Sequence, residues 1–377
     1  MADFGLSDEE KLVQDMMVKF AREELRKVAT EADQHERAPE ELLRKGHSDL
    51  ALAVMSIPES LGGAWDGSPQ QVQQAVRTFE LSYGCAALAL AMPGLGLAAP
   101  ALVGGIATEA QAKKILEPFC GDSPAWASLA LVEGSAGADL SLLETKAEGS
   151  GASWKVTGTK APVLNAARSL GYVVVARASD GGLRVLWVKQ GAPGVTVKEG
   201  KYVGLRAAGL GKVTFENALA EILGADDAKA HAEAAQKILD GARLLVAAAA
   251  AGVAKAALDT AVQYSVSRVQ FGEPIGQKQG ISFMEADMAM DAEAARLLVL
   301  RAASLAQSGK PYGGAAAKAS GLACQAAMRA AVDAVQIHGG YGFIREYPVE
   351  KWMRDAKALS LVVGAPQESY LAAGATL

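Results

Sequence analysis

Two short stretches in the last third of the chain combine residue types that can hold a phosphate group. The first stretch contains Arg268, Phe271, Gly272 and Gln279, and the second contains Gln336, Gly339 and Gly340. Arginine forms charge-assisted hydrogen bonds with phosphate oxygens, and glycine lets a backbone approach a ligand closely. Both stretches could instead be structural, with Arg268 and Phe271 holding a helical hairpin and the glycines forming a turn.

Hydrophobic periodicity indicates the elements that position these stretches. The first stretch lies between two alanine-rich helical runs, expected over residues 237–267 and 282–307. The chain before residue 124 also has helical spacing and begins with a capping box at Ser7 and Glu10. Between residues 125 and 225 the period falls towards two, with strands expected at 154–159, 172–176, 183–188 and 213–215. This order of helices, strands and helices argues against a doubly wound α/β sheet.

The sequence therefore predicts a mainly α protein with a middle β domain. We expect an N-terminal helical domain over 1–124, a middle β domain over 125–225 and a C-terminal helical bundle domain over 226–377.

Composition excludes several classes of function. Of 377 residues, 50% are hydrophobic and 21% are charged, which is typical of a folded globular chain. A net charge of −5 argues against a nucleic-acid partner, and the four scattered histidines predict no metal site. Three widely spaced cysteines favour a reducing compartment. No signal peptide is visible, and the apolar run at 244–251 is too short to cross a membrane, so we expect a cytoplasmic protein without membrane contact.

Three motifs together carry a family resemblance. They are the Arg-x-x-Phe-Gly turn at Arg268, the Gln-x-x-Gly-Gly motif at Gln336, and the stretch Trp352-Met-Arg354-Asp355. In combination they resemble the C-terminal domain of the acyl-CoA dehydrogenase family of flavoproteins. The resemblance implies a β-barrel-like middle domain and a C-terminal four-helix bundle that forms tetramers. It also implies FAD-dependent α,β-dehydrogenation of an acyl-CoA, with an electron-transfer flavoprotein as the electron acceptor.

The resemblance assigns roles to most of the candidate residues. It implies that the ADP half of FAD is held largely by a neighbouring subunit, through Arg268, Phe271, Gly272, Gln279, Gln336, Gly339 and Gly340. By the same resemblance, Asp240 and Arg243 fall where relatives contact CoA, although for Arg243 a surface ion pair is an equal alternative.

Other family positions have lost the side chains that the reaction needs. The two places where relatives carry the catalytic glutamate are Val363 and Ala242, and neither residue can accept a proton. Four positions that supply contacts to the flavin ring are also apolar: Val132, Ala138, Pro162 and Leu164.

Three interpretations follow from this pattern. The chain resembles the base-less subunit of heteromeric acyl-CoA dehydrogenases, which would share FAD with a homologous partner chain and act on fatty acyl or steroid-derived CoA thioesters. Alternatively, it is an active dehydrogenase in which another acid, such as Asp240 or Glu133, is the base. The third interpretation is a non-catalytic binding or scaffold protein of the same fold, in which FAD could be absent.

Overall fold

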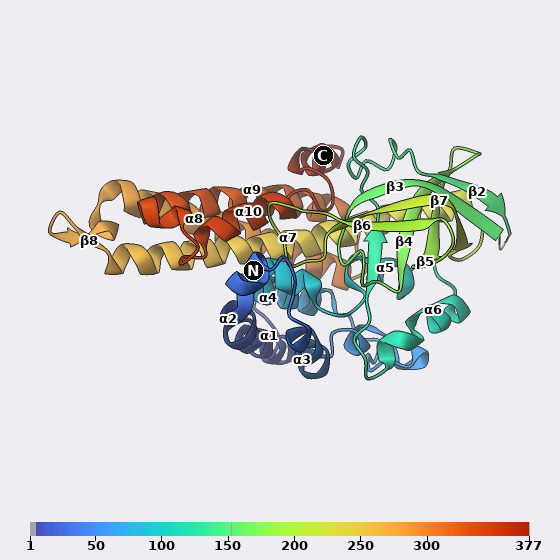
Figure 1. The fold of residues 1–377 in the computed structure, drawn as a ribbon, viewed down its shortest axis with the longest axis horizontal. Coiled ribbons are helices and arrows are strands. Elements are labelled where there is room, and N and C mark those ends of the chain that lie inside the picture. Colours follow the sequence, from blue (N-terminus) through green and yellow to red (C-terminus); the bar gives the residue numbers. More distant parts are fainter. Residues whose placement is uncertain (1–4, 152, 377) are drawn as a thin grey trace.

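The computed structural model describes residues 5–151 and 153–376, and its chain forms three bodies (Figure 1). The first is helical. Its helices are α1 (Asp8–Phe20), α2 (Arg26–Gln34), α3 (Glu40–Leu50), α4 (Gln71–Ala91), α5 (Ala99–Leu102) and α6 (Glu109–Leu116). A single π-helical turn, η1 (Ala21–Leu25), joins α1 to α2. The predicted capping box is present, since the Ser7 side chain accepts from the Glu10 N–H and the Glu10 side chain accepts from the Ser7 N–H.

The middle body is a curved sheet whose pairings close on themselves. Its strands are β1 (Ala127–Ala130), β2 (Lys146–Ser150), β3 (Ser153–Val163), β4 (Gly171–Ala178), β5 (Leu183–Lys189), β6 (Val195–Glu199) and β7 (Gly211–Ile222). Strand β4 pairs with β2, β2 with β3, β3 with β7, β7 with β5, and β5 again with β4. The predicted barrel-like domain is therefore confirmed.

The third body is a bundle of long helices. It contains α7 (Ala228–Ser267), the small hairpin β8–β9 (Val269–Gln270 and Glu273–Pro274), α8 (Gln279–Gln307), α9 (Gly313–His338), α10 (Val349–Leu359) and α11 (Pro366–Gly374). By length and hydropathy α7 could cross a membrane, but 72% of its apolar window is buried inside the protein. Packing against α4, α8 and α9 thus accounts for the apolar character of α7.

The predicted helical runs differ from the structure mainly at their starts. Helix α7 begins at Ala228 instead of residue 237, because Asp227 caps it by accepting the N–H groups of Lys229 and Ala230. The predicted domain limits at 125 and 226 fall between η5 (Glu117–Cys120) and β1 and between β7 and α7. These limits remain predictions, and their outer ends, residues 1–4 and 377, lie outside the described part of the chain.

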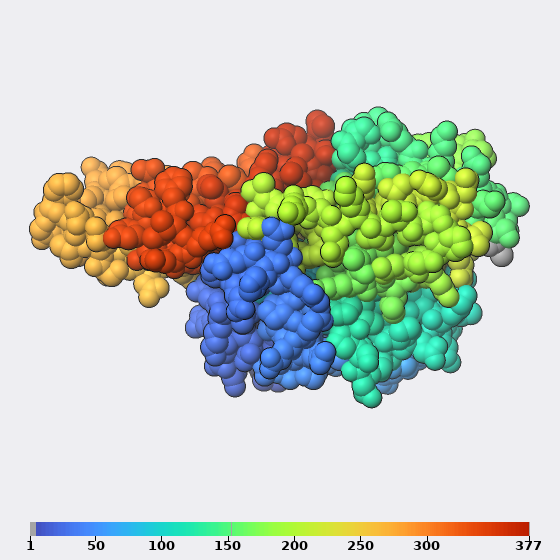
Figure 2. Space-filling view, viewed as in Figure 1, coloured from blue at the N-terminus to red at the C-terminus, as the bar shows by residue number. Residues whose placement is uncertain are grey.

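Figure 1 shows the arrangement that matters for function. The bundle extends away from the β domain, so that the β8–β9 hairpin lies at one end of the molecule and the β domain at the other. The end of the bundle that carries the β8–β9 hairpin projects from the rest of the molecule in the space-filling view (Figure 2).

Candidate functional site

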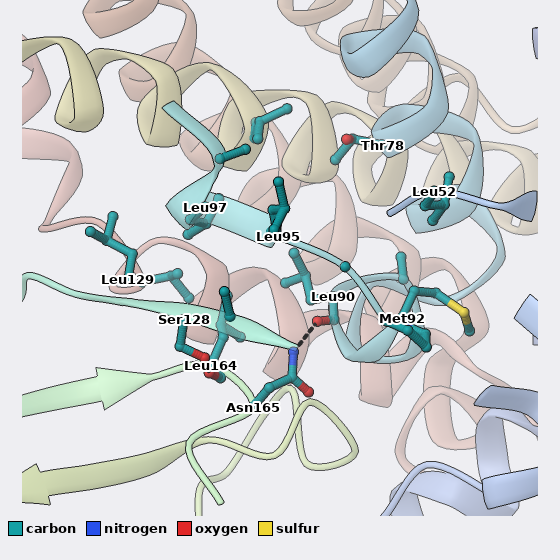
Figure 3. A pocket seen from close by; sticks show the side chains of 18 of the residues that line it. Leu52, Thr78, Leu90, Met92, Leu95, Leu97, Ser128, Leu129, Leu164 and Asn165 are labelled. Atoms are coloured by element: carbon teal, nitrogen blue, oxygen red, sulfur yellow. Dashed lines mark hydrogen bonds between the residues drawn. The ribbon is translucent and has the colours of Figure 1, made fainter. Parts of the chain in front are cut away.

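A cavity lies where the helical bodies meet the β domain. Its walls come from α4, the turn at residues 92–97, the ends of β1 and β3, and α7. Figure 3 shows Thr78 on the α4 side, Leu129 and Leu164 on the strand side, and Leu95 and Leu97 between them. At one edge the Asn165 Nδ2 donates to the backbone oxygen of Leu90 at 2.8 Å, which ties the end of β3 to α4.

The cavity wall carries no proton acceptor of the kind that dehydrogenation needs. Among the described residues that line it, none is an aspartate, glutamate, histidine, cysteine, lysine or tyrosine, and the one ionisable side chain is Arg77. The two positions to which the resemblance assigns the catalytic glutamate are apolar and buried: Val363 is 3% exposed and Ala242 is 0% exposed. The neighbour of Val363, Val362, lines the cavity.

The four predicted ring positions lie at or near this cavity. Val132, Pro162 and Leu164 line it directly. Ala138 is fully buried nearby, and its backbone N–H donates to Glu368 Oε2 at 2.9 Å. None of these four side chains offers a hydrogen bond, and the Ala138 amide already has a partner.

Glu368 lies beside one of these positions, and the sequence did not single it out. Its Oε1 accepts the N–H of Ala365 at 2.9 Å, so the same carboxylate caps α11 and binds the Ala138 loop. The carboxylate fits because Gly137 and Gly364 stand beside it. An added Cβ would lie 2.3 Å from Glu368 Oε1 at the first glycine and 2.4 Å from Oε2 at the second. An anion of this chain therefore lies against the loop that the resemblance assigns to the flavin.

Glu133, one proposed substitute base, is held in a structural ion pair. Its Oε1 lies 2.6 Å from the Nζ of Lys160, and both side chains are almost fully buried. The Glu133 carboxylate also accepts the N–H groups of Glu144 at 2.7 Å and Thr145 at 3.1 Å. Burial alone would raise the pKa of Glu133, but the Lys160 charge and these hydrogen bonds outweigh burial and hold it below its usual value. A carboxylate with these partners is a poor proton acceptor.

Asp240, the other proposed base, lines a second cleft instead of the cavity. That cleft shares Ser56, Gln74, Ala99 and Leu245 with the cavity, so the two are contiguous. The Asp240 carboxylate accepts from Gln236 Nε2 at 2.8 Å, and burial raises its pKa.

The predicted CoA contact Arg243 lies beside Asp240. Its NH1 is a loose 3.9 Å from Asp240 Oδ1, and Arg243 is only 4% exposed, so it is not a surface ion pair.

The candidate phosphate-binding residues gather at the opposite end of the bundle. A shallow pocket there is lined by Arg268, Gly339 and Gly340, together with aromatic side chains such as Tyr341. The Arg268 guanidinium lies over the Tyr341 ring, 5.7 Å from its centroid. Nothing lies within 4 Å of an added Cβ at Gly340, so the glycine faces open space.

The other predicted residues of this set lie outside that pocket. Phe271 and Gly272 occupy the exposed tip of the β8–β9 hairpin, Gln279 begins α8, and Gln336 is exposed on α9. Gly339 also has a structural reason to be glycine, since its φ of +58° and ψ of −134° suit no other residue.

The cavity and the pocket at Arg268 of one chain lie too far apart to hold the same cofactor molecule. Helix α7 has 40 residues and spans about 60 Å at 1.5 Å per residue. Ala242 lies in its first half, beside the cavity end, and Arg268 caps its last turn. The two positions are on the order of 35–40 Å apart along the helix, which is farther than one dinucleotide reaches.

The third motif of the resemblance is structural. Arg354 forms a bidentate pair with Asp33, at 3.0 and 2.7 Å, and a second pair with Glu350. The adjacent Asp355 is 0% exposed, binds the Lys351 Nζ at 2.5 Å and accepts the Leu205 N–H. This motif fastens α10 to the N-terminal helices and to the loop after β6.

Comparison with known proteins identifies the family. Three family models match in chain order: the N-terminal domain of acyl-CoA dehydrogenase over residues 7–122, the middle domain over 128–218 and the C-terminal domain over 232–368. The chain belongs to the acyl-CoA dehydrogenase family. The fold predicted from the motifs is thereby confirmed in all three of its parts.

Relatives with a known description are similar over nearly the whole length of this chain. It is 33% identical to the short-chain specific acyl-CoA dehydrogenase of Megasphaera elsdenii, with 100% of this chain and 99% of that protein covered. It is 32% identical to the short-chain specific enzyme of Clostridium acetobutylicum, with 98% of each covered. Among solved structures, butyryl-CoA dehydrogenase from Megasphaera elsdenii superposes with a TM-score of 0.89 at 33% identity, covering 100% of this chain and 99% of that one.

Members of this family are FAD flavoproteins. The cavity and the pocket at Arg268 differ in how well they fit that cofactor. The cavity fits the flavin ring poorly, because the four positions that the resemblance assigns to ring contacts are apolar and Glu368 accepts the Ala138 N–H. The pocket at the other end of the bundle fits a phosphate-bearing group, since it is lined by the exposed Arg268 and by the open backbone of Gly340.

Proposed function

We propose that this chain is the base-less subunit of a heteromeric acyl-CoA dehydrogenase. It would lend the residues around Arg268 to the ADP half of a FAD whose ring lies in a homologous partner chain. The observation that carries this proposal is the lack of any proton acceptor on the described wall of the cavity. Because FAD supplies only the hydride acceptor when it is bound, the α-proton of the acyl-CoA still needs a base.

The chemistry of the cavity end supports a chain that does not turn over substrate alone. Val363 and Ala242 replace both family bases with buried hydrocarbon. Glu133 is ionised and saturated with partners, so it is not free to take a proton. Each of these observations removes one way in which this chain could carry out the first step itself.

The geometry of the bundle supports the sharing of a cofactor. Arg268, Gly339 and Gly340 line an open pocket with no acid on its wall among the described residues. The length of α7 separates that pocket from the cavity of the same chain. A second chain must therefore present the dinucleotide to it, and the family's oligomeric assembly offers such a neighbour.

Asp240 supports a second candidate function, an active dehydrogenase with a relocated base. Its carboxyl lines a cleft that is contiguous with the cavity, and burial raises its pKa above the usual value. We place this second because Asp240 does not line the cavity itself and is already bonded to Gln236.

Co-expression with a homologue that carries the usual glutamate tests the proposal. We expect the chain alone to be colourless and inactive towards acyl-CoA, and the pair to co-purify with FAD and reduce it when acyl-CoA is added. Arg268→Ala should lower the FAD content of the pair at least tenfold. Arg301→Ala, an exposed arginine roughly 33 Å along α8 from the hairpin, should leave the FAD content unchanged.

Three results separate the alternatives. A yellow homomer that acyl-CoA reduces, and that Asp240→Asn inactivates, would establish the relocated base. A chain that stays colourless and inert with every homologue would instead be a binding or scaffold protein. Equal FAD loss in the Arg268 and Arg301 variants would refute the role of Arg268.

A further inference from the structure

Arg77 projects from α4 into the wall of the cavity and has no partner. Its side chain makes no hydrogen bond and no ion pair with any residue in 5–151 or 153–376, and yet it is only partly accessible. Burial lowers its pKa to about 10, and no carboxylate offsets that effect. The guanidinium is therefore cationic at neutral pH and uncompensated within the chain.

Two other enclosed arginines show how this chain usually offsets a buried positive charge. Arg354 binds both Asp33 and Glu350, and Arg184 binds Asp180 and Asp226. An enclosed cation without a counter-ion is costly.

The nearest acid along α4 does not supply the missing charge. Glu80 faces a separate cleft, where it accepts from Gln14 Nε2 at 2.6 Å. The partner of Arg77 must therefore come from outside the chain.

The polar groups beside Arg77 form one small patch in an otherwise apolar cavity. Gln74, Arg77 and Thr78 lie on one face of α4. The Gln74 side chain has no hydrogen-bond partner in the described chain, and the Thr78 hydroxyl, which donates to the Gln74 backbone oxygen, can still accept. The facing wall consists of aliphatic side chains, including Leu129, Leu131, Val132, Leu164 and Val362. A matching ligand is a hydrocarbon chain with one anionic, hydrogen-bonding end.

We propose that the cavity binds an acyl chain that ends in a carboxylate, and that Arg77 and Gln74 recognise this carboxylate. A guanidinium and a carboxylate match in charge and in their two-pronged geometry. The ring end of the cavity, at Val132 and Leu164, receives the hydrocarbon part. If the chain has the proposed function, the ligand is a CoA thioester of a dicarboxylic acid. Only the thioester part of this inference rests on the proposed function; the recognition of the carboxylate does not.

Binding measurements on the full chain test this without flavin or a partner chain. Calorimetry compares octanoyl-CoA with the mono-CoA thioester of octanedioic acid, and the comparison is repeated at four, six and ten carbons. We expect the carboxyl-bearing ligand to bind the wild-type chain at least tenfold more tightly at one or more lengths. Free octanoate is titrated in parallel, because a fatty acid presents the same chemistry from a different source.

Two substitutions separate recognition from folding. Arg77→Met removes the charge at similar length, and the preference for the carboxyl-bearing ligand should fall to within twofold. Arg77→Lys keeps the charge and should retain part of the preference, and Arg301→Met is the matched surface control. Circular dichroism establishes that each variant is folded.

The outcomes are decisive in both directions. If octanoate binds as tightly as the carboxyl-bearing thioester and depends equally on Arg77, the anion site stands and its ligand is a free fatty acid. Equal affinity of the wild-type chain for both thioesters would overturn the proposal. So would an unchanged preference in Arg77→Met, or no binding of any of these ligands. A failed co-expression test with intact Arg77-dependent binding would refute only the proposed function.

Discussion

Replacing Lys160 with methionine should destabilise the β domain strongly, because it leaves Glu133 charged and buried. The Lys160 side chain is 0% exposed and that of Glu133 is 5% exposed, with 2.6 Å between Nζ and Oε1. Breaking such a pair from one side costs about 3–5 kcal/mol. The amides of Glu144 and Thr145 still bind the carboxylate in the variant. We therefore expect the lower end of that range, about 3 kcal/mol.

The loss should depend on pH in a direction that the structure dictates. In the wild-type protein the pKa of Glu133 is held below its ordinary value, because the Lys160 charge and hydrogen bond outweigh burial. Glu133 therefore contributes stability above its unfolded pKa, and that contribution is lost as the pH falls through its folded pKa. In Lys160→Met the charge and hydrogen bond of Lys160 are gone. We expect burial, the largest single effect on Glu133, to outweigh the hydrogen bonds from Glu144 and Thr145 and to raise the folded pKa above the unfolded value. The native variant takes up a proton more readily than its unfolded state, so its deficit shrinks between pH 7.5 and pH 5.5.

Urea unfolding followed by tryptophan fluorescence measures both quantities, since Trp154 and Trp187 are buried in the β domain. Lys146→Met, on the exposed face of β2, is the matched control and should change the free energy of unfolding by less than 0.5 kcal/mol or so. The double variant Glu133→Gln/Lys160→Met should recover much of the loss. A deficit below about 1 kcal/mol that does not change with pH would refute the structural role of Glu133 and restore it as a candidate base.

Three further substitutions test other parts of the structure. Arg77→Met should raise the free energy of unfolding by about 1–3 kcal/mol, measured by urea titration, because it removes an unpaired buried charge; a destabilised variant would mean that Arg77 has a structural partner. Glu368→Ala should lower it by about 1 kcal/mol through loss of the α11 cap, whereas Gln367→Ala, its exposed neighbour, should not. Asp240→Asn should change the FAD-dependent activity of the heteromer less than twofold, and a loss of about 100-fold or more would instead identify a general base.

The fold could be predicted because its periodicities are strong and its order is simple. Strand β4 reads Tyr172-Val-Val-Val-Ala176 and is buried along nearly its whole length, so a continuous apolar run marked it correctly. The closure of the sheet could not be read from the sequence alone, since it depends on β5 pairing with both β4 and β7.

The motifs grouped the candidate residues for the ADP half of FAD, and their role stays a prediction. The structure brings Arg268 and Gly339 into one pocket, whereas Phe271 and Gln336 lie outside it. The sequence did not predict a role for Arg77, because an arginine on an amphipathic helix ordinarily packs its aliphatic part on the protein surface and keeps its charged group in water. In the folded chain Arg77 instead lines a cavity together with residues at the ends of β1 and β3, and it is only partly accessible.

Glu368 was missed for a related reason. An acid in the first turn of a helix is ordinary for capping, and its second bond joins it to Ala138, far away in sequence. A signal was present in hindsight: Gly137 and Gly364 each stand where a side chain would displace the carboxylate.

Folding stability accounts for the residues found near the cavity but does not account for the residue at the tip of the β8–β9 hairpin. At the cavity end, valine at 363 and alanine at 242 pack into the core, so their presence in place of an acid avoids the cost of burying a carboxylate. Folding alone would favour these residues. At the hairpin tip, Phe271 is 93% exposed and has a φ of +55°, an unfavourable backbone conformation for an aromatic residue that contributes nothing to this chain's core. Strain that folding does not require is a reason to propose a site of function. We therefore propose that Phe271 contributes to a surface that a partner chain completes, where it would contact the partner's dinucleotide.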